Sequence, residues 1–478
     1  MKDITKIPIL LAGRRVEPDG DFYEFDFEDS RVLLAKPSLK EIQDVATIDI
    51  GKELRELSID DITAFFDRVR IDWSDPDNTW RQMAIREGAR CNGYSTAMVE
   101  WDANFLANSL VRAKQYDTLE TDLGDPTLLD DWNRVKATLL RCWPVGLISH
   151  IMVGNVPMAS LFTLWRSLVT KNITVAKVPK RDPISALCFA NCMADIGEEH
   201  PVVKALSVLY WEPECSIENF LLNASNVVSV WGRGQSVASI KRRIPVGTDL
   251  IEFGPKRSFA LIMDGVTDWD MVGMRVAYAV IMYDQEGCFS PQDVFVIGDA
   301  QPLAEAVTVW LAKAAKAIPR RALDADGEAH ISRARIEAMT DGHEVLEPSG
   351  SEWTVIVIDG PEIVDEHPLS RTLYVHSISK LGDVLATIDP LVQTVSVEPW
   401  SHVMEVADAL TQAGADRIVR AGHMGRMRPG FVHDGFHPMR RMVRWTTIEK
   451  GFEQKYRFAN YTSEQDEARM KALLGDGL

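Results

Sequence analysis

The sequence contains few cysteines, and none of them stands in a metal-binding or disulfide-rich arrangement. Six cysteines are spread over 478 residues without a CxxC pair, at positions 91, 142, 188, 192, 215 and 288. This spacing predicts no metal site and no disulfide framework. Reduced thiols, as in a cytoplasmic protein, are expected.

Long apolar runs are also missing, and acidic residues outnumber basic ones. No stretch reaches the roughly 18 consecutive apolar residues that a membrane helix needs, and the apolar run before Gly13 is too short for a secretory signal. The 70 acidic against 52 basic residues give a net charge of −18 and a pI near 5.1. A soluble, cytoplasmic protein without a nucleic-acid partner is therefore expected.

The first 141 residues carry only weak structural signals. With 46% hydrophobic and 26% charged residues, the whole chain is an ordinary globular one, long enough for two or three domains. Helical spacing predicts helices at 58–69, with Ser58 as the N-cap, at 107–116 and at 128–140. The turn-forming LGDP at 123–126 separates the last two. A mostly helical supporting region is predicted.

From residue 142 onward, apolar strands alternate with helices. Residues 145–153 (VGLISHIMV) predict a buried strand, and GNVP at 154–157 leads into a helix whose first turn accepts the proline. The same unit recurs after 173–178 and 226–230, and a further strand is predicted at 259–263. The repeats indicate a doubly wound α/β fold, which binds ligands beyond the carboxyl ends of its strands.

A glycine-rich turn stands at one of these strand ends. It consists of Trp231, Gly232, Arg233 and Gly234, ahead of a predicted helix at 236–243. Backbone donors and the helix dipole there favour a pyrophosphate. The GxGxxG spacing is incomplete, because position 237 is valine, so a plain glycine turn is the alternative.

The second half repeats the α/β pattern and places one thiol in a connecting loop. Helices are predicted at 269–282 and 302–318, with strands at 293–297 and 353–358. The stretch YDQEGCFSPQ puts Cys288 between the first helix and the first strand. Functional groups concentrate in such loops. The alternative is a small buried hydrophobe, which is what most free cysteines are.

Six motifs occur in order along the second and third quarters and the C-terminal part of the chain: GNVP (154–157), AKVPKRDP (176–183), VWGRG (230–234), IEFGPK (251–256), EGCFSPQDVFV (286–296) and GFVHDGFHPMRRMVRW (430–445). Together they resemble one known family, the LuxC-type acyl-CoA reductases of bacterial bioluminescence, which are similar to aldehyde dehydrogenases in fold and thiol chemistry. The resemblance implies an aldehyde-dehydrogenase-like α/β fold, with a Rossmann-type cofactor domain and an α/β catalytic domain.

The resemblance also implies catalytic roles. Cys288 would be the nucleophile that attacks a thioester and carries the acyl group. The side-chain amide of Asn155 and the backbone N–H of Cys288 would stabilise the oxyanion. Glu252 corresponds to the residue that activates water in aldehyde-oxidising relatives, whereas a reductase must keep water away from the acyl-enzyme. Glu252 would then help proton transfer at Cys288 or be structural.

The reduction implied needs a bound reduced nicotinamide, because no side chain can supply a hydride. The form predicted is NADPH. By analogy, Lys177 would contact the adenosine ribose. Lys180 stands where many NAD-using relatives have a glutamate, and with Arg181 beside it the pair favours a 2′-phosphate. A solvated loop is the alternative for these two charges.

The expected organisation has four parts: a supporting region (1–141), an NADPH-binding domain (142–265), a catalytic thiol domain (266–425) and a closing and oligomerisation segment (426–478). In the last part, His433, His437 and the arginines at 440, 441 and 444 are expected to close the catalytic domain or line its entrance, with the arginines near coenzyme A phosphates. A metal site is not expected there. A surface helix is predicted at 464–474.

Three functions remain open from the sequence. The first is NADPH-dependent reduction of an acyl thioester, from acyl-CoA or from a partner acyl-protein synthetase, to an aldehyde by a homo-oligomeric enzyme. The second is an NAD(P)-dependent aldehyde dehydrogenase working in the oxidative direction. The third is a silent nucleotide-binding scaffold, against which the thiol at 288 argues.

Overall fold

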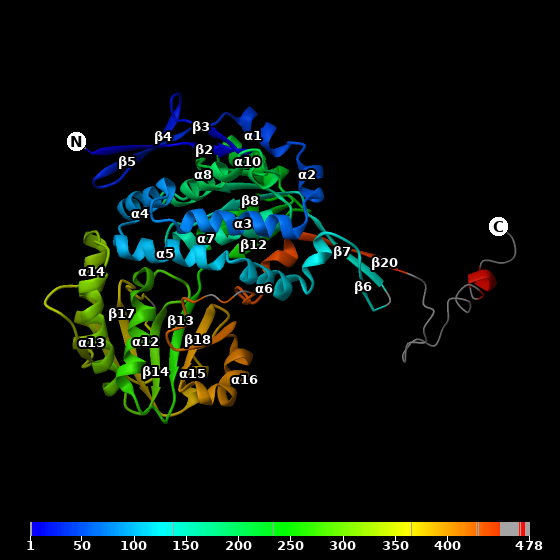
Figure 1. Cartoon of the computed structure of the whole chain (residues 1–478). Helices are drawn as coiled ribbons and strands as arrows, with labels where there is room; N and C mark the ends of the chain where they lie inside the picture. Colours follow the sequence, from blue (N-terminus) through cyan, green and yellow to red (C-terminus); the bar gives the residue numbers. More distant parts are fainter. Residues whose placement is uncertain are drawn as a thin grey trace.

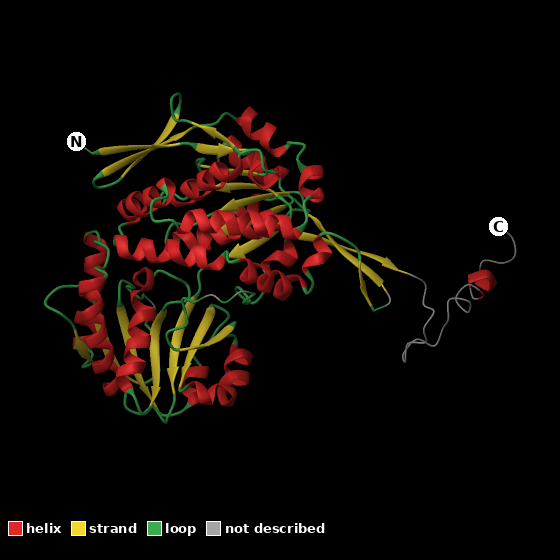
Figure 2. Ribbon diagram, in the orientation of Figure 1, coloured by secondary structure: helices red, strands yellow, loops and turns green. Residues whose placement is uncertain are grey.

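Two large sheets organise the chain (Figure 1). The computed structural model describes residues 2–449 except 137, 233, 365, 427 and 429, together with 468 and 470–473. Helices flank the strands of both sheets (Figure 2). The α/β class expected from the alternating pattern is confirmed. No helix in the described ranges is both long and apolar enough to span a bilayer.

The first sheet has seven strands in the order β12-β11-β8-β9-β10-β2-β3. The five strands from β12 to β10 are parallel, and β2 and β3 extend the sheet antiparallel. Their bounds are β2 Ile9–Leu11, β3 Arg14–Val16, β8 Leu147–Ile151, β9 Ile173–Lys177, β10 Leu206–Leu209, β11 Val227–Trp231 and β12 Asp249–Phe253. The crossover helices are α7 Pro157–Val169, α8 Ser185–Gly197, α9 Pro201–Lys204, α10 Ser216–Ala224 and α11 Gly234–Arg243. The strands predicted at 145–153, 173–178 and 226–230 are confirmed.

The second sheet also has seven strands, in the order β15-β16-β17-β14-β13-β18-β19, and only β15 is antiparallel to its neighbour. The bounds are β13 Arg257–Ile262, β14 Pro291–Ile297, β15 Glu344–Leu346, β16 Thr354–Asp359, β17 Thr372–Ile378, β18 Val392–Glu398 and β19 Arg417–Arg420. Its helices are α12 Trp269–Ile281, α13 Gln301–Ala317, α14 Ala325–Thr340, α15 Leu381–Leu385 and α16 Val403–Ala413. These match the predicted helices and strands of the second half to within a few residues.

Each face of the second sheet has its own core. Side chains alternate along a strand, so Ala260 and Ile262 of β13 join the cluster under α12 and α13. Phe259 and Leu261 of the same strand point the other way, into the cluster under α16. Burial on both faces explains why β13 has a continuous apolar sequence rather than an alternating one.

The N-terminal region contains more strand than the sequence suggested. Before the helices come β1 Asp3–Ile7, β2, β3, β4 Phe22–Asp26 and β5 Ser30–Ala35, and β1, β5 and β4 form a separate three-stranded sheet. The helices are α1 Leu39–Ala46, α2 Gly51–Glu56, α3 Ile59–Ser74, α4 Thr79–Asn92, α5 Thr96–Ser109 and α6 Arg112–Leu123. The N-cap at Ser58 is confirmed by a complete capping box with Asp61. The helix predicted at 107–116 is instead the junction of α5 and α6.

The prediction of a helix at 128–140 is wrong. After a short 3₁₀ turn, these residues form β6 (Asn133–Val135) and β7 (Thr138–Pro144), and β7 pairs along its length with β20 (Val443–Glu449). The partner strand lies about 300 residues later in the chain, which local spacing cannot reveal. The three strands form an arm that projects from the body (Figure 1). The helix predicted at 464–474 lies largely outside the described residues.

Candidate active site

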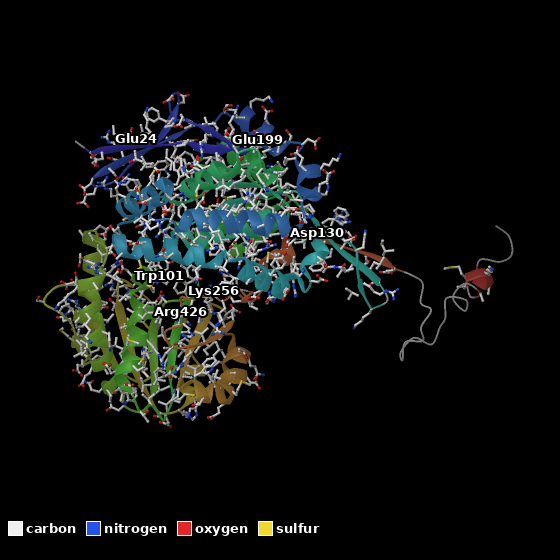
Figure 3. The ribbon with its side chains drawn as sticks, viewed as in Figure 1. Glu24, Trp101, Asp130, Glu199, Lys256 and Arg426 are labelled. Atoms are coloured by element: carbon white, nitrogen blue, oxygen red, sulfur yellow. The ribbon has the colours of Figure 1, made fainter. Side chains whose placement is uncertain are left out.

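A cavity of about 480 Å³ lies between the strand ends of the first sheet and the loop that carries Cys288. The turn after β8, the ends of β11 and β12, the loop 285–289 and the segment around His433 all contribute lining residues. Lys256, one of them, lies where the upper and lower halves of the molecule face each other (Figure 3). The cavity therefore joins the edge where α/β sheets bind ligands to the thiol loop.

Cys288 follows an unusual left-handed turn. After α12, Tyr283, Asp284 and Gln285 have φ of 51°, 50° and 68°, a conformation that costs non-glycine residues roughly 1–2 kcal/mol each. The turn is held by Asp284, whose carboxylate pairs with Arg371 at 2.7 Å, both side chains being 1% exposed. The Asp284 carbonyl also accepts a hydrogen bond from the backbone N–H of Ser370. This buried pair offsets the strain and fixes the direction from which the chain reaches the thiol.

The Cys288 thiol is reachable from the cavity but is protonated in this environment. Its side chain is half-buried and lines the cavity. Burial and the nearby carboxylate of Asp434 raise the pKa of the thiol to about 12, although Gln393 donates a hydrogen bond to Sγ at 3.2 Å. The same Gln393 amide donates to Asp434 at 2.6 Å. The thiol needs help to ionise, and Asp434 opposes that ionisation.

This arrangement predicts that Asp434→Asn makes the thiol more reactive. Removing the anion lowers the pKa of Cys288, so at pH 8 a larger fraction is thiolate and iodoacetamide should react about three- to tenfold faster. In the wild type, the rate should rise about tenfold per pH unit from pH 7 to 10, because the pKa lies above this range. Both are measured by peptide mapping in a Cys215→Ser background, since the other four cysteines are buried. A plateau in the wild-type rate below pH 9 would contradict the raised pKa.

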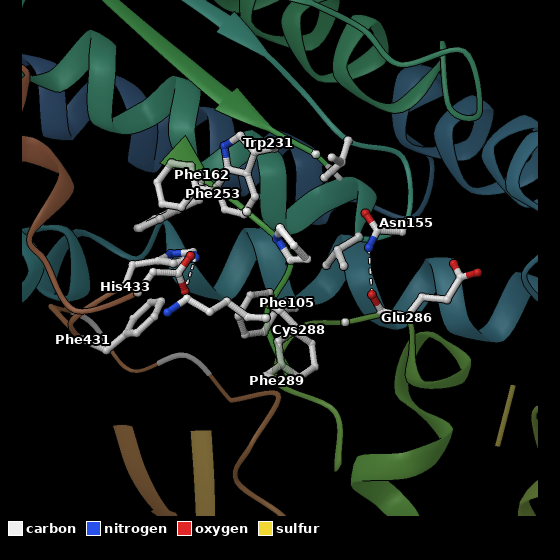
Figure 4. A pocket seen from close by; sticks show the side chains of 18 of the residues that line it. Phe105, Asn155, Phe162, Trp231, Phe253, Glu286, Cys288, Phe289, Phe431 and His433 are labelled. Carbon is white, nitrogen blue, oxygen red and sulfur yellow. Dashed lines mark hydrogen bonds and ion pairs between the residues drawn. The ribbon is translucent and has the colours of Figure 1, made fainter. Parts of the chain in front are cut away.

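Asn155 also lines the cavity and connects the first half of the chain to the loop that carries Cys288. It follows β8 in the turn before α7, where Pro157 occupies the first helical turn as predicted. Its Nδ2 donates to the carbonyl of Glu286 at 2.8 Å, two residues before Cys288 (Figure 4). One N–H of the amide remains for an oxyanion. The structure thus brings Asn155 and Cys288 to one cavity.

Glu286 is a residue of this site that the sequence did not single out. Its carboxylate pairs with Arg181 at 2.5 Å and with Arg321 at 2.6 Å, and the Tyr94 hydroxyl donates to it at 2.7 Å. Because Tyr94 and Arg181 belong to the first half of the chain, Glu286 braces the thiol loop against that half. The only feature of the sequence that could have pointed to Glu286 is its position two residues before Cys288. Arg181 is therefore engaged with the thiol loop and not, as expected, held beside Lys180 for a ribose phosphate.

Glu252 does not reach the cavity, contrary to the expectation of a catalytic role. On β12 its side chain points away from the face that Phe253 presents, because neighbours on a strand alternate. Phe253 lines the cavity and stacks on Trp231 with ring centroids 4.0 Å apart. Glu252 instead pairs with Lys241 of α11 at 2.8 Å and is 37% exposed.

We therefore expect Glu252→Gln to change the rate of acyl-adduct formation and of turnover by less than about threefold, since an exposed ion pair contributes roughly 0–1 kcal/mol. The comparison is made on purified variants by intact-mass and steady-state assays, with Lys241→Gln as the matched control. If turnover fell 10²-fold or more in the Glu252 variant alone, Glu252 would have a catalytic role.

The expected cofactor residues occupy the strand ends of the first sheet. Lys177, at the end of β9, is buried and pairs with Glu218 at 3.3 Å, while the exposed Lys180 pairs with Glu212 at 3.1 Å. Gly232 and Gly234 stand at the start of α11, and a Cβ placed on Gly234 would meet nothing within 4 Å. Arg233 lies outside the described residues. Open glycine backbone at a helix N-terminus, at the carboxyl end of a parallel strand, is a donor set that fits a dinucleotide.

The C-terminal motif divides between the cavity and the scaffold. His433 and Asp434 line the cavity. His437 and Arg440 instead contact Asp122 of α6. The histidine Nδ1 lies 3.0 Å from the Asp122 carboxylate, and the arginine Nε donates to the Asp122 backbone carbonyl. Arg441 pairs with Asp249 of β12. These last two arginines are therefore bound to the protein rather than free for coenzyme A phosphates. Within the part of the chain that the structure describes, no cluster of metal-ligating residues is present.

Comparisons with known proteins bear on the family and on the fold. A family model described as acyl-CoA reductase (LuxC) matches residues 54–445. The long-chain acyl-protein thioester reductase of Aliivibrio fischeri is 30% identical over 96% of this chain and 95% of its own, and that of Vibrio harveyi is 28% identical over 93% and 94%. Among solved structures, aldehyde dehydrogenase 21 from Physcomitrella patens has a TM-score of 0.72 at 14% identity, covering 94% of this chain and 98% of its own. The last likeness confirms the aldehyde-dehydrogenase-like fold, and the match over most of the chain shows that this protein belongs to the LuxC family of acyl-CoA reductases.

Proposed function

We propose that this protein reduces an acyl thioester to the aldehyde, with Cys288 carrying the acyl group in a covalent intermediate and NADPH as the reductant. The observation that supports this most directly is the Cys288 thiol, which faces a cavity continuous with the strand ends of the first sheet. The names of the LuxC relatives, which are acyl-protein thioester reductases, point to the same chemistry.

The first half-reaction needs only groups of this chain. The Cys288 thiolate adds to the thioester carbonyl, and the free N–H of Asn155 and the backbone N–H of Cys288 stabilise the oxyanion that forms. When the tetrahedral species collapses, the carbon–sulfur bond to the donor breaks, and the donor leaves as a thiol with the one proton that the Cys288 thiol lost on ionising. The acyl group then remains on Cys288 as a thioester of equal oxidation state.

The second half-reaction needs a hydride at the acyl carbon, which a reduced nicotinamide would supply when bound. Trp231, Gly232 and Gly234 at the end of β11, with Lys177 and Lys180 at the end of β9, are the residues that would hold that cofactor. The same oxyanion donors then act again, and the bond to Cys288 breaks as the aldehyde leaves. The cysteine returns as a thiolate, whose raised pKa favours taking up a proton.

The position of Glu252 favours reduction over aldehyde oxidation to the acid. Hydrolysis of an acyl-enzyme requires a base that activates water, and Glu252 is bound to Lys241 outside the cavity. The acyl-enzyme is therefore left for reduction.

We also propose that the protein is cytoplasmic and forms a homo-oligomer that pairs through the β20-β7-β6 arm. The acyl donor in this proposal is either acyl-CoA or an acyl-protein synthetase.

The test has two stages. Incubation with acyl-CoA but no cofactor should give an acyl adduct by intact-mass analysis, located on Cys288 by peptide mapping. Addition of NADPH should then discharge the adduct with loss of cofactor absorbance and release of one aldehyde per NADPH consumed. If no adduct forms, while NADP is reduced rapidly by an aldehyde alone, the oxidative function replaces this proposal.

A further inference from the structure

Asp102 is a buried carboxylate that the proposed chemistry does not use. It lies on α5, is 1% exposed, and forms no ion pair with a basic side chain in the described part of the chain. Burial raises the pKa of Asp102 to about 7. Burying a carboxylate without a cation costs stability unless hydrogen bonds satisfy its oxygens. The groups that hydrogen-bond to Asp102 therefore indicate its role.

One oxygen of Asp102 caps helix α7, which follows the turn that carries Asn155. Oδ2 accepts a hydrogen bond from the backbone N–H of Met158 at 2.9 Å. The first N–H groups of a helix have no partner within the helix, and Val156, the N-cap residue of α7, has no side chain that could accept from them. A carboxylate also interacts favourably with this end of the helix dipole. Asp102 therefore fixes the start of α7, just after Asn155.

The other oxygen of Asp102 binds the left-handed turn that precedes the thiol. Oδ1 accepts a hydrogen bond from the Tyr283 hydroxyl at 2.5 Å, and the contact is fully buried. The Tyr283 ring packs edge-on against Trp101 and against Phe289, the neighbour of Cys288. Helix α5 faces the lower half of the molecule (Figure 1), and its side chains share a buried cluster with Tyr283 and Phe289. Asp102 therefore also fixes the start of the thiol loop.

A single carboxylate thus holds both sides of the catalytic centre. Asn155 and Cys288 come from segments that are far apart in the chain, and Asn155 reaches the thiol loop through its hydrogen bond to the Glu286 carbonyl. An oxyanion donor is effective only when it lies within hydrogen-bonding distance of the charge that develops. A displacement of about 1 Å can cost about 10²-fold in rate. A link that sets the separation of the two segments therefore controls how well Asn155 acts.

Building on the proposed function, we infer that Asp102 and Tyr283 are positioning residues, whose hydrogen bond holds the Asn155 turn and the thiol loop at the separation that the oxyanion requires. Neither side chain lines the cavity, so both act through Asn155 and do not touch the substrate. Loss of this bond should slow attack on a thioester, which forms an oxyanion. It should not slow alkylation of the thiol, which forms none.

The test compares two reactions of Cys288 in Tyr283→Phe, which removes the hydroxyl and keeps the ring. Acylation by hexadecanoyl-CoA without cofactor is followed by intact mass, and alkylation by iodoacetamide is followed by peptide mapping. We expect the acylation rate at saturating thioester to fall about 10- to 100-fold. The alkylation rate, and the thioester concentration that gives half the maximal rate, should change less than about threefold.

The chain offers a matched control. Tyr116→Phe also removes a hydrogen bond between a tyrosine and a carboxylate, since the Tyr116 hydroxyl donates to Asp60 at 3.1 Å, but this bond lies at the surface. Both reactions of Cys288 should keep their wild-type rates in Tyr116→Phe.

Further variants show whether the effect passes through Asn155. In an Asn155→Ala background, Tyr283→Phe should lower acylation by less than about threefold, because the group that the bond positions is already absent. Asp102→Leu should lower acylation as Tyr283→Phe does. Asp102→Asn should recover most of the rate, because its amide can accept from the Met158 N–H and donate to the Tyr283 hydroxyl.

The outcomes separate the inference from the proposed function. Equal losses of acylation and alkylation in Tyr283→Phe, wild-type acylation in that variant, or full additivity with Asn155→Ala would overturn the positioning role while adducts still support acyl transfer. An Asp102→Asn variant as slow as Asp102→Leu would also overturn it. If the wild type forms no acyl adduct, the proposed function fails and the inference falls with it.

Discussion

Cys288→Ala is expected to abolish both the acyl adduct and aldehyde formation, lowering turnover by at least about 10³-fold, because removing a covalent nucleophile leaves only binding and oxyanion stabilisation. The alanine side chain still fits a position that is half-buried at the cavity, so the fold should be retained. The measurements are intact mass after exposure to acyl-CoA, and aldehyde production with NADPH.

A matched control exists in the chain. Cys215 is the other cysteine that is not fully buried, and its sulfur caps α10 by accepting from the backbone of Glu218. Cys215→Ser preserves an acceptor at that cap and should leave the adduct and the turnover intact. If Cys288→Ala still accumulates an acyl group while Cys215→Ser does not, the nucleophile has been assigned to the wrong loop.

Asp284→Asn is expected to produce the largest loss of stability. Arg371 is 1% exposed and its side chain has Asp284 as its one hydrogen-bonding partner in the described structure, its terminal nitrogens being unpaired. Removing the carboxylate charge leaves a buried cation uncompensated, which costs about 3–5 kcal/mol. The denaturation midpoint should fall accordingly, and the thiol loop should lose its support for the left-handed turn at 283–285.

Two further variants identify the cause. In Asp284→Asn with Arg371→Met, both charges are gone, so much of the lost stability should return. Glu56→Gln removes one partner of the exposed Lys52–Glu56 pair and should cost no more than about 1 kcal/mol. Destabilisation of equal size in the single and double variants would show that the buried pair does not hold this turn.

Two of the predicted site residues, Asn155 and Cys288, line one cavity. Asn155 and Cys288 come from turns that could be recognised locally, one between a buried strand and a proline-started helix, the other between an apolar helix and a strand. Parallel α/β units bring such turns to one edge. The same reasoning could not orient Glu252, because a shift of one residue along a strand reverses the face on which a side chain lies.

Other residues became visible only through contacts between distant segments. Gln393 and Asp434 reach the thiol from β18 and from the C-terminal loop. Glu286 gains its arginines from positions 181 and 321. Each of these side chains is an ordinary polar residue in its own stretch of sequence, so no local pattern distinguishes it.

The sequence by itself determined the α/β alternation, the loop position of Cys288 and the family, because hydrophobic periodicity and ordered motifs are properties of neighbouring residues. Only the tertiary structure decided which polar groups surround the thiol, that Glu252 lies outside the cavity, and that residues 138–144 pair with β20. These depend on strand faces, on pairing across hundreds of residues and on burial, which arise when the segments pack together.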